Sequence, residues 1–271
     1  MLLISIIIVI IIYILINAQS RELTAFPKII FQTWKTHTLP KQFAYWAETW
    51  KTHNPYKYVL WDDAENRAFV TEHFDWFLPV YDGYDAGIKR ADAIRYMFLY
   101  KYGGIYADLD FECLKPFDEL LEKYESYDII LGSMESDLSS WHLSNNIPNA
   151  IMISKPGCTF WLKVLKEMER RSKWVARPEV QTGPIVLKDV YRWSCFLGPG
   201  VARDCFLGPE VARAFGYSIK VLEPAALYPI SWVLNDDERK VALASELTTL
   251  TQTMKAKYPD SYAVTYWAHS W

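Results

Sequence analysis

Short apolar segments alternate with amphipathic helical segments through the first half of the 271-residue chain. The apolar run PKIIFQTW (27–34) precedes a Trp-rich helical segment at 41–53, and the run YKYVLWDD (56–63) precedes one or two helices within 65–81. A strand–helix–strand–helix order predicts a parallel or mixed sheet with helices on its faces. Ligands of such sheets gather at the carboxyl ends of the strands, so functional residues are expected there.

The second half of the chain continues this pattern. Strands are predicted at 127–132, 149–154 and 218–223, and a helix at about 158–173. Because 51% of the residues are hydrophobic, a disordered chain is excluded. One α/β domain over residues 27–271 accounts for all of these segments.

The N-terminus is an apolar run without charges from Met1 to Ile16. As a helix it would be about 24 Å long, short of the ~30 Å hydrocarbon core yet workable in a thin membrane. We therefore expect a signal-anchor at 1–17 followed by a stem at 18–26. A signal peptide cleaved near Ala18 is the alternative.

Charge and cysteine content exclude several classes of site. A net charge of -3, with no run of Lys or Arg, gives no electrostatic footprint for nucleic acid. The four cysteines have no C-x-x-C spacing, which excludes the common zinc and thioredoxin-type motifs, while one or two disulfides remain possible in a lumenal domain.

The repeated nonapeptides CFLGPGVAR and CFLGPEVAR within 195–213 are interpreted as a tandem duplication in a surface loop.

The segment GGIYADLD (103–110) places two aspartates in an apolar stretch. Asp is disfavoured in strands and costly to bury without a partner. In an extended strand alternate residues share a face, so Asp108 and Asp110 are expected to point the same way, with Cα atoms about 6.6 Å apart. Two such carboxylates can bracket one divalent cation that keeps open positions for phosphate oxygens. The segment therefore predicts a metal–diphosphate site.

A predicted helix from about 86 to 102 leads into this segment. Asp85 is its expected N-cap, and Gly103 stands where a left-handed C-cap residue would. Its second half is apolar nearly all round, which predicts deep packing. Asp92 and Arg95, at i and i+3, share a face. They form either a surface ion pair or part of a polar pocket; we favour the pocket, because the other exposed side chains of the helix precede Asp92.

The stretch IKRADAIRYMFLYKYGGIYADLDFECLKPFD resembles the signature of glycosyltransferase family 32, which includes initiating mannosyltransferases and inositol-phosphoceramide mannosyltransferases. The likeness extends, in order, through PKIIFQTWK, NPYKYVLWDD, NAIMISKPG, QTGPIVL, LYPISW and the terminal YAVTYWAHSW. It implies a GT-A type nucleotide-sugar-binding fold over 27–271, with a mixed, mostly parallel sheet flanked by helices.

The resemblance also implies roles for single residues. Asp110 would bind Mn²⁺ or Mg²⁺ directly, and Asp108 would contact the metal through water as well as the donor. The implied catalytic residues are Asp108, Asp110 and Arg95, and the implied donor-binding residues include Gln32, Thr33, Trp34, Asp92, Arg95, Asp108, Ser270 and Trp271. Two further polar residues, Asn149 and Glu135, could touch the donor sugar or could cap loops.

The C-terminal end departs from the family pattern. Many relatives carry His where this chain has Thr265 and Tyr266, and Gly where it has His269. His269 is the expected replacement for the third metal ligand, and a frayed terminus is the alternative.

The expected function is retaining, metal-dependent transfer of a hexose from a nucleotide sugar to a glycan or a sphingolipid such as inositol phosphoceramide. GDP-mannose is the first expected donor, and UDP-galactose or another UDP-hexose is the alternative. The protein is expected on the lumenal face of the Golgi or ER, or secreted if the N-terminus is cleaved.

The alternative function is that of a catalytically silent sugar- or nucleotide-binding protein of the same fold. A two-metal phosphohydrolase is disfavoured because five His and one D-x-D supply too few ligands.

Overall fold

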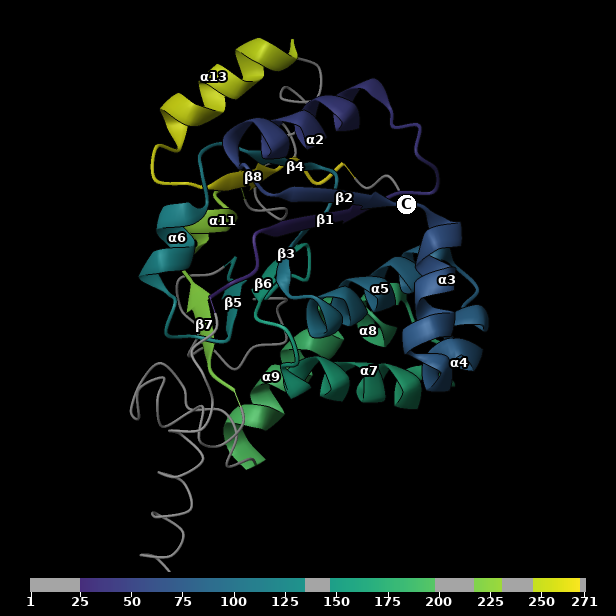
Figure 1. Cartoon of the computed structure of the whole chain (residues 1–271). Coiled ribbons are helices and arrows are strands. Elements are labelled where there is room, and N and C mark those ends of the chain that lie inside the picture. The colour runs from purple at the N-terminus through teal and green to yellow at the C-terminus, as the bar shows by residue number, and fades with distance from the viewer. Residues whose placement is uncertain (1–24, 135–146, 198–216, 231–245, 269–271) are drawn as a thin grey trace, which may run out of the picture.

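A computed structural model describes residues 25–134, 147–197, 217–230 and 246–268 (Figure 1). Within these ranges, no helix has both the length and the apolar character needed to cross a membrane. Several predictions fall outside the described residues: the membrane or signal segment, nearly all of the stem and of the duplication, and the residues Glu135, His269, Ser270 and Trp271.

The described residues form a six-stranded sheet in the order β2-β1-β3-β6-β5-β7 and a two-stranded sheet of β4 and β8. The strands are β1 (Ile29–Thr33), β2 (Lys57–Trp61), β3 (Gly104–Ala107), β4 (Phe111–Cys113), β5 (Ile129–Gly132), β6 (Ile151–Ser154), β7 (Ile219–Leu222) and β8 (Ala263–Thr265). The helices are α2 (Lys41–His53), α3 (Asp63–His73), η1 (Asp75–Phe77), α4 (Leu78–Asp82), α5 (Gly87–Lys101), α6 (Asp118–Lys123), α7 (Thr159–Arg171), α8 (Pro178–Gln181), α9 (Pro184–Leu197), α11 (Pro224–Leu227) and α13 (Leu247–Lys257).

Strand directions in the large sheet are mixed and mostly parallel. β1 runs parallel to β2 and to β3, and β5 runs parallel to β7. β6 is antiparallel to both β3 and β5. This topology confirms the predicted mixed, mostly parallel sheet flanked by helices.

Successive side chains of each strand point to opposite faces of the large sheet, so the core has one layer on each face. In β1, Phe31 packs with apolar side chains of α3, α5, α7 and α9, whereas its neighbour Ile30 packs with those of α2, α6, α11 and β4. Figure 1 shows α5, α7 and α9 on one side of the sheet and α2, α13 and the β4–β8 pair on the other. The continuous apolar runs of these strands are thus explained by burial of the sheet on both faces.

Helix α5 is as deeply packed as its sequence predicts, with ten of its fifteen residues buried. Its expected cap is wrong, because Ala86 is the N-cap and no side chain caps the helix. Asp85 instead places a carboxylate oxygen 2.8 Å from the Lys89 ammonium, one turn along the helix. At the other end Gly103 and Gly104 have φ of 67° and 87°, so the predicted left-handed turn into β3 is confirmed.

Gly104 is required at this turn. A Cβ at this position would lie 2.5 Å from the Ile29 carbonyl oxygen, because β3 passes close to β1. We expect Gly104→Ala to lower the free energy of unfolding by about 1–3 kcal/mol, measured by urea denaturation. Gly87→Ala, whose added Cβ meets nothing within 4 Å, is the control and should cost no stability. Equal unfolding free energies in the two variants would contradict this reading of the turn.

Two of the four cysteines are described together with their side chains. Cys113 and Cys158 are both buried and both free. Asn54 donates a hydrogen bond to the Cys113 thiol, which in turn donates to the Lys115 carbonyl oxygen. These two cysteines therefore take part in core packing rather than in a disulfide with each other.

Candidate active site

The two aspartates of the D-x-D segment lie in a turn, not in an extended strand as predicted. β3 ends at Ala107, and the Phe111 N–H donates to the Asp108 carbonyl oxygen over 3.1 Å, which closes a turn before β4. The chain turns here because the next strand, β4, pairs with β8 in the two-stranded sheet and not with the large sheet. The strand prediction is therefore wrong, yet both carboxylates still line one cavity.

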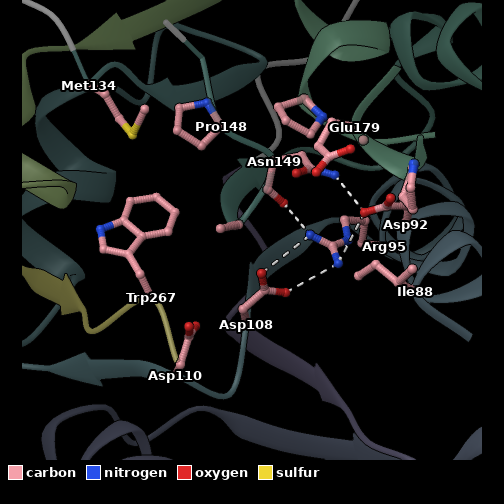
Figure 2. A pocket seen from close by; sticks show the side chains of 14 residues that line it. Ile88, Asp92, Arg95, Asp108, Asp110, Met134, Pro148, Asn149, Glu179 and Trp267 are labelled. Carbon is pink, nitrogen blue, oxygen red and sulfur yellow. Dashed lines mark hydrogen bonds and ion pairs between the residues drawn. The ribbon is translucent and has the colours of Figure 1, made fainter. Parts of the chain in front are cut away.

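This cavity has a volume of about 360 Å³ and lies beyond the carboxyl end of β3, where ligands of such sheets are expected. Figure 2 shows Asp92 and Arg95 on one wall, Trp267 and Met134 on the opposite wall, and Asp108 with Asp110 between them. The remaining lining residues are Ile88, Pro148, Asn149, Ala150, Pro178, Glu179, Gly183 and Pro184.

Arg95 is the cation of this cavity and is almost completely buried, with 1% of its surface exposed. Its Nη2 lies 3.3 Å from a carboxylate oxygen of Asp92 and 3.3 Å from one of Asp108. Its Nη1 donates to the Asn149 carbonyl oxygen over 2.8 Å. The surface ion pair is thus excluded, and the predicted polar pocket is confirmed.

The Asp92 carboxylate is held by one ion pair and two hydrogen bonds. Besides its contact with Arg95, it accepts from the Asn149 side-chain amide (2.8 Å) and from the Thr182 hydroxyl (2.7 Å). The Asn149 amide also donates to the Tyr96 hydroxyl over 3.0 Å. Sequence reasoning missed Thr182 and Tyr96, although Thr182 lies in the QTGPIVL segment that carries part of the family likeness.

Partial burial changes the acidity of the two D-x-D carboxyls. Burial raises the pKa of Asp108 to about 6, although the Arg95 guanidinium opposes this shift. Burial also raises the pKa of Asp110, against the hydrogen bond that its carboxylate accepts from the Ala268 N–H. For both carboxylates, the cost of desolvation therefore exceeds the stabilisation that nearby positive charge provides.

The charge balance of the lining fits a divalent cation. Asp92, Asp108, Asp110 and Glu179 line the cavity with a single described cation, Arg95, which leaves three uncompensated negative charges at full ionisation. A hard ion with oxygen ligands would supply the missing charge at Asp108 and Asp110, since Asp92 is already occupied by protein donors. The predicted ligand types for Mn²⁺ or Mg²⁺ are thus brought together at this cavity.

The C-terminal segment closes one side of the site. Antiparallel pairing of β8 with β4 carries the chain past Asp110, whose carbonyl oxygen accepts from the Tyr266 N–H and whose carboxylate accepts from the Ala268 N–H (2.9 Å). Trp267 lines the cavity, stacks on Tyr228 and donates its indole N–H to the Ile230 carbonyl oxygen. The residues expected to complete the metal site and to contact phosphate, 269–271, follow directly but lie outside the described ranges.

Three of the predicted donor-binding residues, Gln32, Thr33 and Trp34, lie behind this site. The Gln32 side-chain amide donates to the Asp108 carbonyl oxygen (3.1 Å) and accepts from the Tyr58 hydroxyl (2.6 Å). The Thr33 hydroxyl donates to the Trp61 carbonyl oxygen, and Trp34 packs edge-on against a Phe ring of α2. None of the three lines the described cavity, so their predicted contact with a nucleotide stays a prediction.

Gln32 therefore braces the backbone of Asp108. We expect Gln32→Met to lower the free energy of unfolding by about 1–3 kcal/mol, because it leaves the Tyr58 hydroxyl and the Asp108 carbonyl without this partner. Urea denaturation measures the loss, and the exposed Gln252→Met on α13 is the control with the same chemical change. If both variants unfold at the same urea concentration, the bracing role is wrong.

A second group of metal-ligand types lies elsewhere on the surface. Single ligand atoms of His37, Asp62 and Glu65 come within 4.8 Å of one another. Asp62 caps α3 by accepting from the Ala64 and Glu65 N–H groups, and the Glu65 carboxylate accepts from the Asp62 N–H. This capping box explains the cluster without an ion.

Comparison with known proteins agrees with the geometry. Residues 40–127 match the family described as glycosyltransferase sugar-binding region containing DXD motif, and the matched range includes the α5–β3 turn, Asp108 and Asp110. Residues 40–127 thus carry the sugar-binding region that this glycosyltransferase family shares.

Several curated relatives of this chain are mannosyltransferases by name. Inositol phosphoceramide mannosyltransferase 3 of Schizosaccharomyces pombe is 36% identical over 185 residues, which cover 65% of this chain and 47% of the relative. Mannosyl phosphorylinositol ceramide synthase CSH1 of Saccharomyces cerevisiae is 35% identical, covering 65% and 46%. The initiation-specific alpha-1,6-mannosyltransferase of Candida albicans is 31% identical, covering 44% and 35%. The matches thus span less than half the length of each of these three relatives.

Two solved glycosyltransferases resemble this chain more distantly. The PaToxG glycosyltransferase has a TM-score of 0.47 at 17% identity, covering 70% of this chain and 78% of that protein. A glycosyltransferase involved in glycosylation of the major capsid of PBCV-1 has a TM-score of 0.39 at 12% identity, covering 89% and 95%. The mixed, mostly parallel sheet flanked by helices agrees with the GT-A type fold expected from the sequence.

Proposed function

We propose that this protein is a retaining, metal-dependent glycosyltransferase that moves a hexose from a nucleotide sugar, with GDP-mannose as the first donor. The observation that carries the proposal is the cavity beyond β3, where three aspartates face one buried arginine. Support for mannose comes from the names of the relatives, which share the D-x-D region.

Asp110, Asp108 and, by analogy, His269 would hold Mn²⁺ or Mg²⁺, which neutralises the charge that develops on a leaving diphosphate. Arg95 fixes the orientation of Asp108 through its 3.3 Å contact, and the Ala268 N–H orients the Asp110 carboxylate. Trp267 and Met134 form an apolar wall that limits water beside the reacting sugar.

Retention of configuration in this proposal follows from attack on the face that the diphosphate leaves. The acceptor hydroxyl oxygen forms the new bond to the anomeric carbon as the bond to the phosphate oxygen breaks. The leaving phosphate oxygen takes the acceptor proton. Asp92 and Asn149 would hold donor hydroxyls, since both line the cavity and hydrogen-bond to each other.

The proposed acceptor is a glycan or a glycolipid such as inositol phosphoceramide. The N-terminal segment at 1–17 would anchor the protein to a membrane, with the domain on the lumenal face of the Golgi or ER, or would be cleaved to give a secreted form.

Release of nucleoside diphosphate from purified full-length protein tests the proposal. GDP-mannose, UDP-galactose and other UDP-hexoses are each incubated with and without Mn²⁺. The account predicts manganese-dependent release that is fastest from GDP-mannose. Binding of nucleotide sugar without any release would indicate the catalytically silent alternative.

A further inference from the structure

The three exposed large apolar side chains of the described residues lie near Arg170, whose guanidinium is beside Trp174 and which lines a groove with Trp193. They are Trp174, Val175 and Trp193, of which Val175 is fully exposed and the two Trp are 41% and 46% exposed. Trp174 and Val175 occupy the loop 172–177 between α7 and α8, and Trp193 lies on α9. Clustered exposed apolar groups mark an interaction surface more often than isolated ones do.

Positive charge surrounds these side chains. Residues 163–177 contain six cationic and two anionic side chains, a net charge of +4 in a chain whose total is -3. Lys163, Lys166 and Arg170 of α7 line a groove of about 470 Å³ together with Trp193. The exposed side chains Trp174 and Val175 thus lie in a segment of net positive charge.

The loop between α7 and α8 is held in place. The Gln181 side-chain amide donates to the carbonyl oxygens of Arg171, Ser172 and Trp174 over 3.0, 3.0 and 3.1 Å. The Arg170 guanidinium lies 4.8 Å from the centre of the Trp174 ring. The backbone is therefore fixed by three bonds from a buried residue while its apolar side chains face solvent.

This loop leads directly into the wall of the cavity. Its last residue, Arg177, is followed by Pro178 and Glu179, which begin α8 and line the cavity. Figure 2 shows Glu179 across the cavity from Asp110. A surface that binds the loop 172–177 would therefore lie next to the cavity.

We infer that a basic–aromatic face, formed by Arg170, Lys173, Trp174, Val175, Arg177 and Trp193, docks on an anionic lipid bilayer. Trp rings prefer the headgroup level, and Lys and Arg are attracted to anionic lipid. A second copy of this chain is disfavoured, because a symmetric contact would place like charge against like charge. The inference rests on the proposed function and deepens it, since a lipid-linked acceptor must reach the cavity from the bilayer.

Hydrogen–deuterium exchange of the full-length chain on vesicles tests this docking. We expect amides of 172–177 to exchange about tenfold more slowly on vesicles with about one-third phosphatidylinositol, which carries the inositol phosphate headgroup of the proposed acceptor, than on phosphatidylcholine vesicles. Lys173→Glu/Arg177→Glu should abolish the difference. Lys41→Glu/Lys57→Glu, which changes two exposed lysines outside this face by the same charge, should keep it.

Three results would overturn the inference: equal exchange on both vesicles, a difference that survives Lys173→Glu/Arg177→Glu, or slow exchange without vesicles that depends on protein concentration. The last would indicate self-association. Thermal shift with Mn²⁺ and GDP, measured for each variant in detergent, reports the donor site separately. Loss of that shift with retained vesicle protection would contradict the proposed function and leave the docking intact.

Discussion

Asp110→Asn should reduce metal-dependent transfer by at least about 10²–10³-fold while leaving the fold intact. The amide keeps the size of the side chain and an oxygen that can accept from the Ala268 N–H, but it removes the negative charge offered to the ion. Initial rates of sugar transfer across a series of Mn²⁺ concentrations measure the loss. The free energy of unfolding without metal should stay within about 1 kcal/mol of the unsubstituted protein.

The exposed Asp260→Asn is the matched control and should keep the full rate. A variant at Asp110 that transfers sugar as fast as this control would remove the carboxylate from the metal site. A variant that unfolds much more easily without metal would show that Asp110 serves the fold rather than an ion.

Arg95→Met should lower the free energy of unfolding by about 3–5 kcal/mol, the largest loss of stability that we expect for a single substitution here. Without the guanidinium, the buried Asp92 and the partly buried Asp108 keep their negative charge without a described cation beside them. Urea denaturation measures the effect. Transfer should be lost as well, because Asp108 would no longer be held against the metal.

Arg67→Met provides the comparison. Arg67 makes two hydrogen bonds to Asp82, of 2.9 and 2.8 Å, but its side chain is 56% exposed, so its loss should cost far less stability than the loss of Arg95. Equal losses of unfolding free energy at the two positions would mean that burial of Arg95 does not make its ion pairs critical.

Saturating Mn²⁺ should recover part of the stability lost in Arg95→Met, since a bound cation stabilises the folded state.

Much of the fold could be predicted because its signals are local. The apolar strands, the buried α5 and the left-handed Gly103 each follow from a few adjacent residues. The pairing of Asp92 with Arg95 followed from their spacing on that helix. Asp85 was a local prediction that failed, because its carboxylate pairs with Lys89 instead of the helix N-terminus.

The missed features depend on contacts between distant segments. The turn at Asp108–Asp110 exists because the next strand, β4, pairs outside the large sheet with β8, which lies about 150 residues later in the chain. Thr182 reaches Asp92 across 90 residues, a hydrogen bond that no local pattern records. Gln32 lies at the end of β1 as predicted, but its side chain binds the Asp108 backbone.

A crystal structure of the full-length protein with Mn²⁺ and GDP tests the central claim most directly. The account predicts one manganese ion at the Asp108 and Asp110 carboxylates, with oxygens of both GDP phosphates in its coordination sphere. A structure in which GDP binds while these two carboxylates contact no metal, or in which the metal binds at another set of residues, would contradict it.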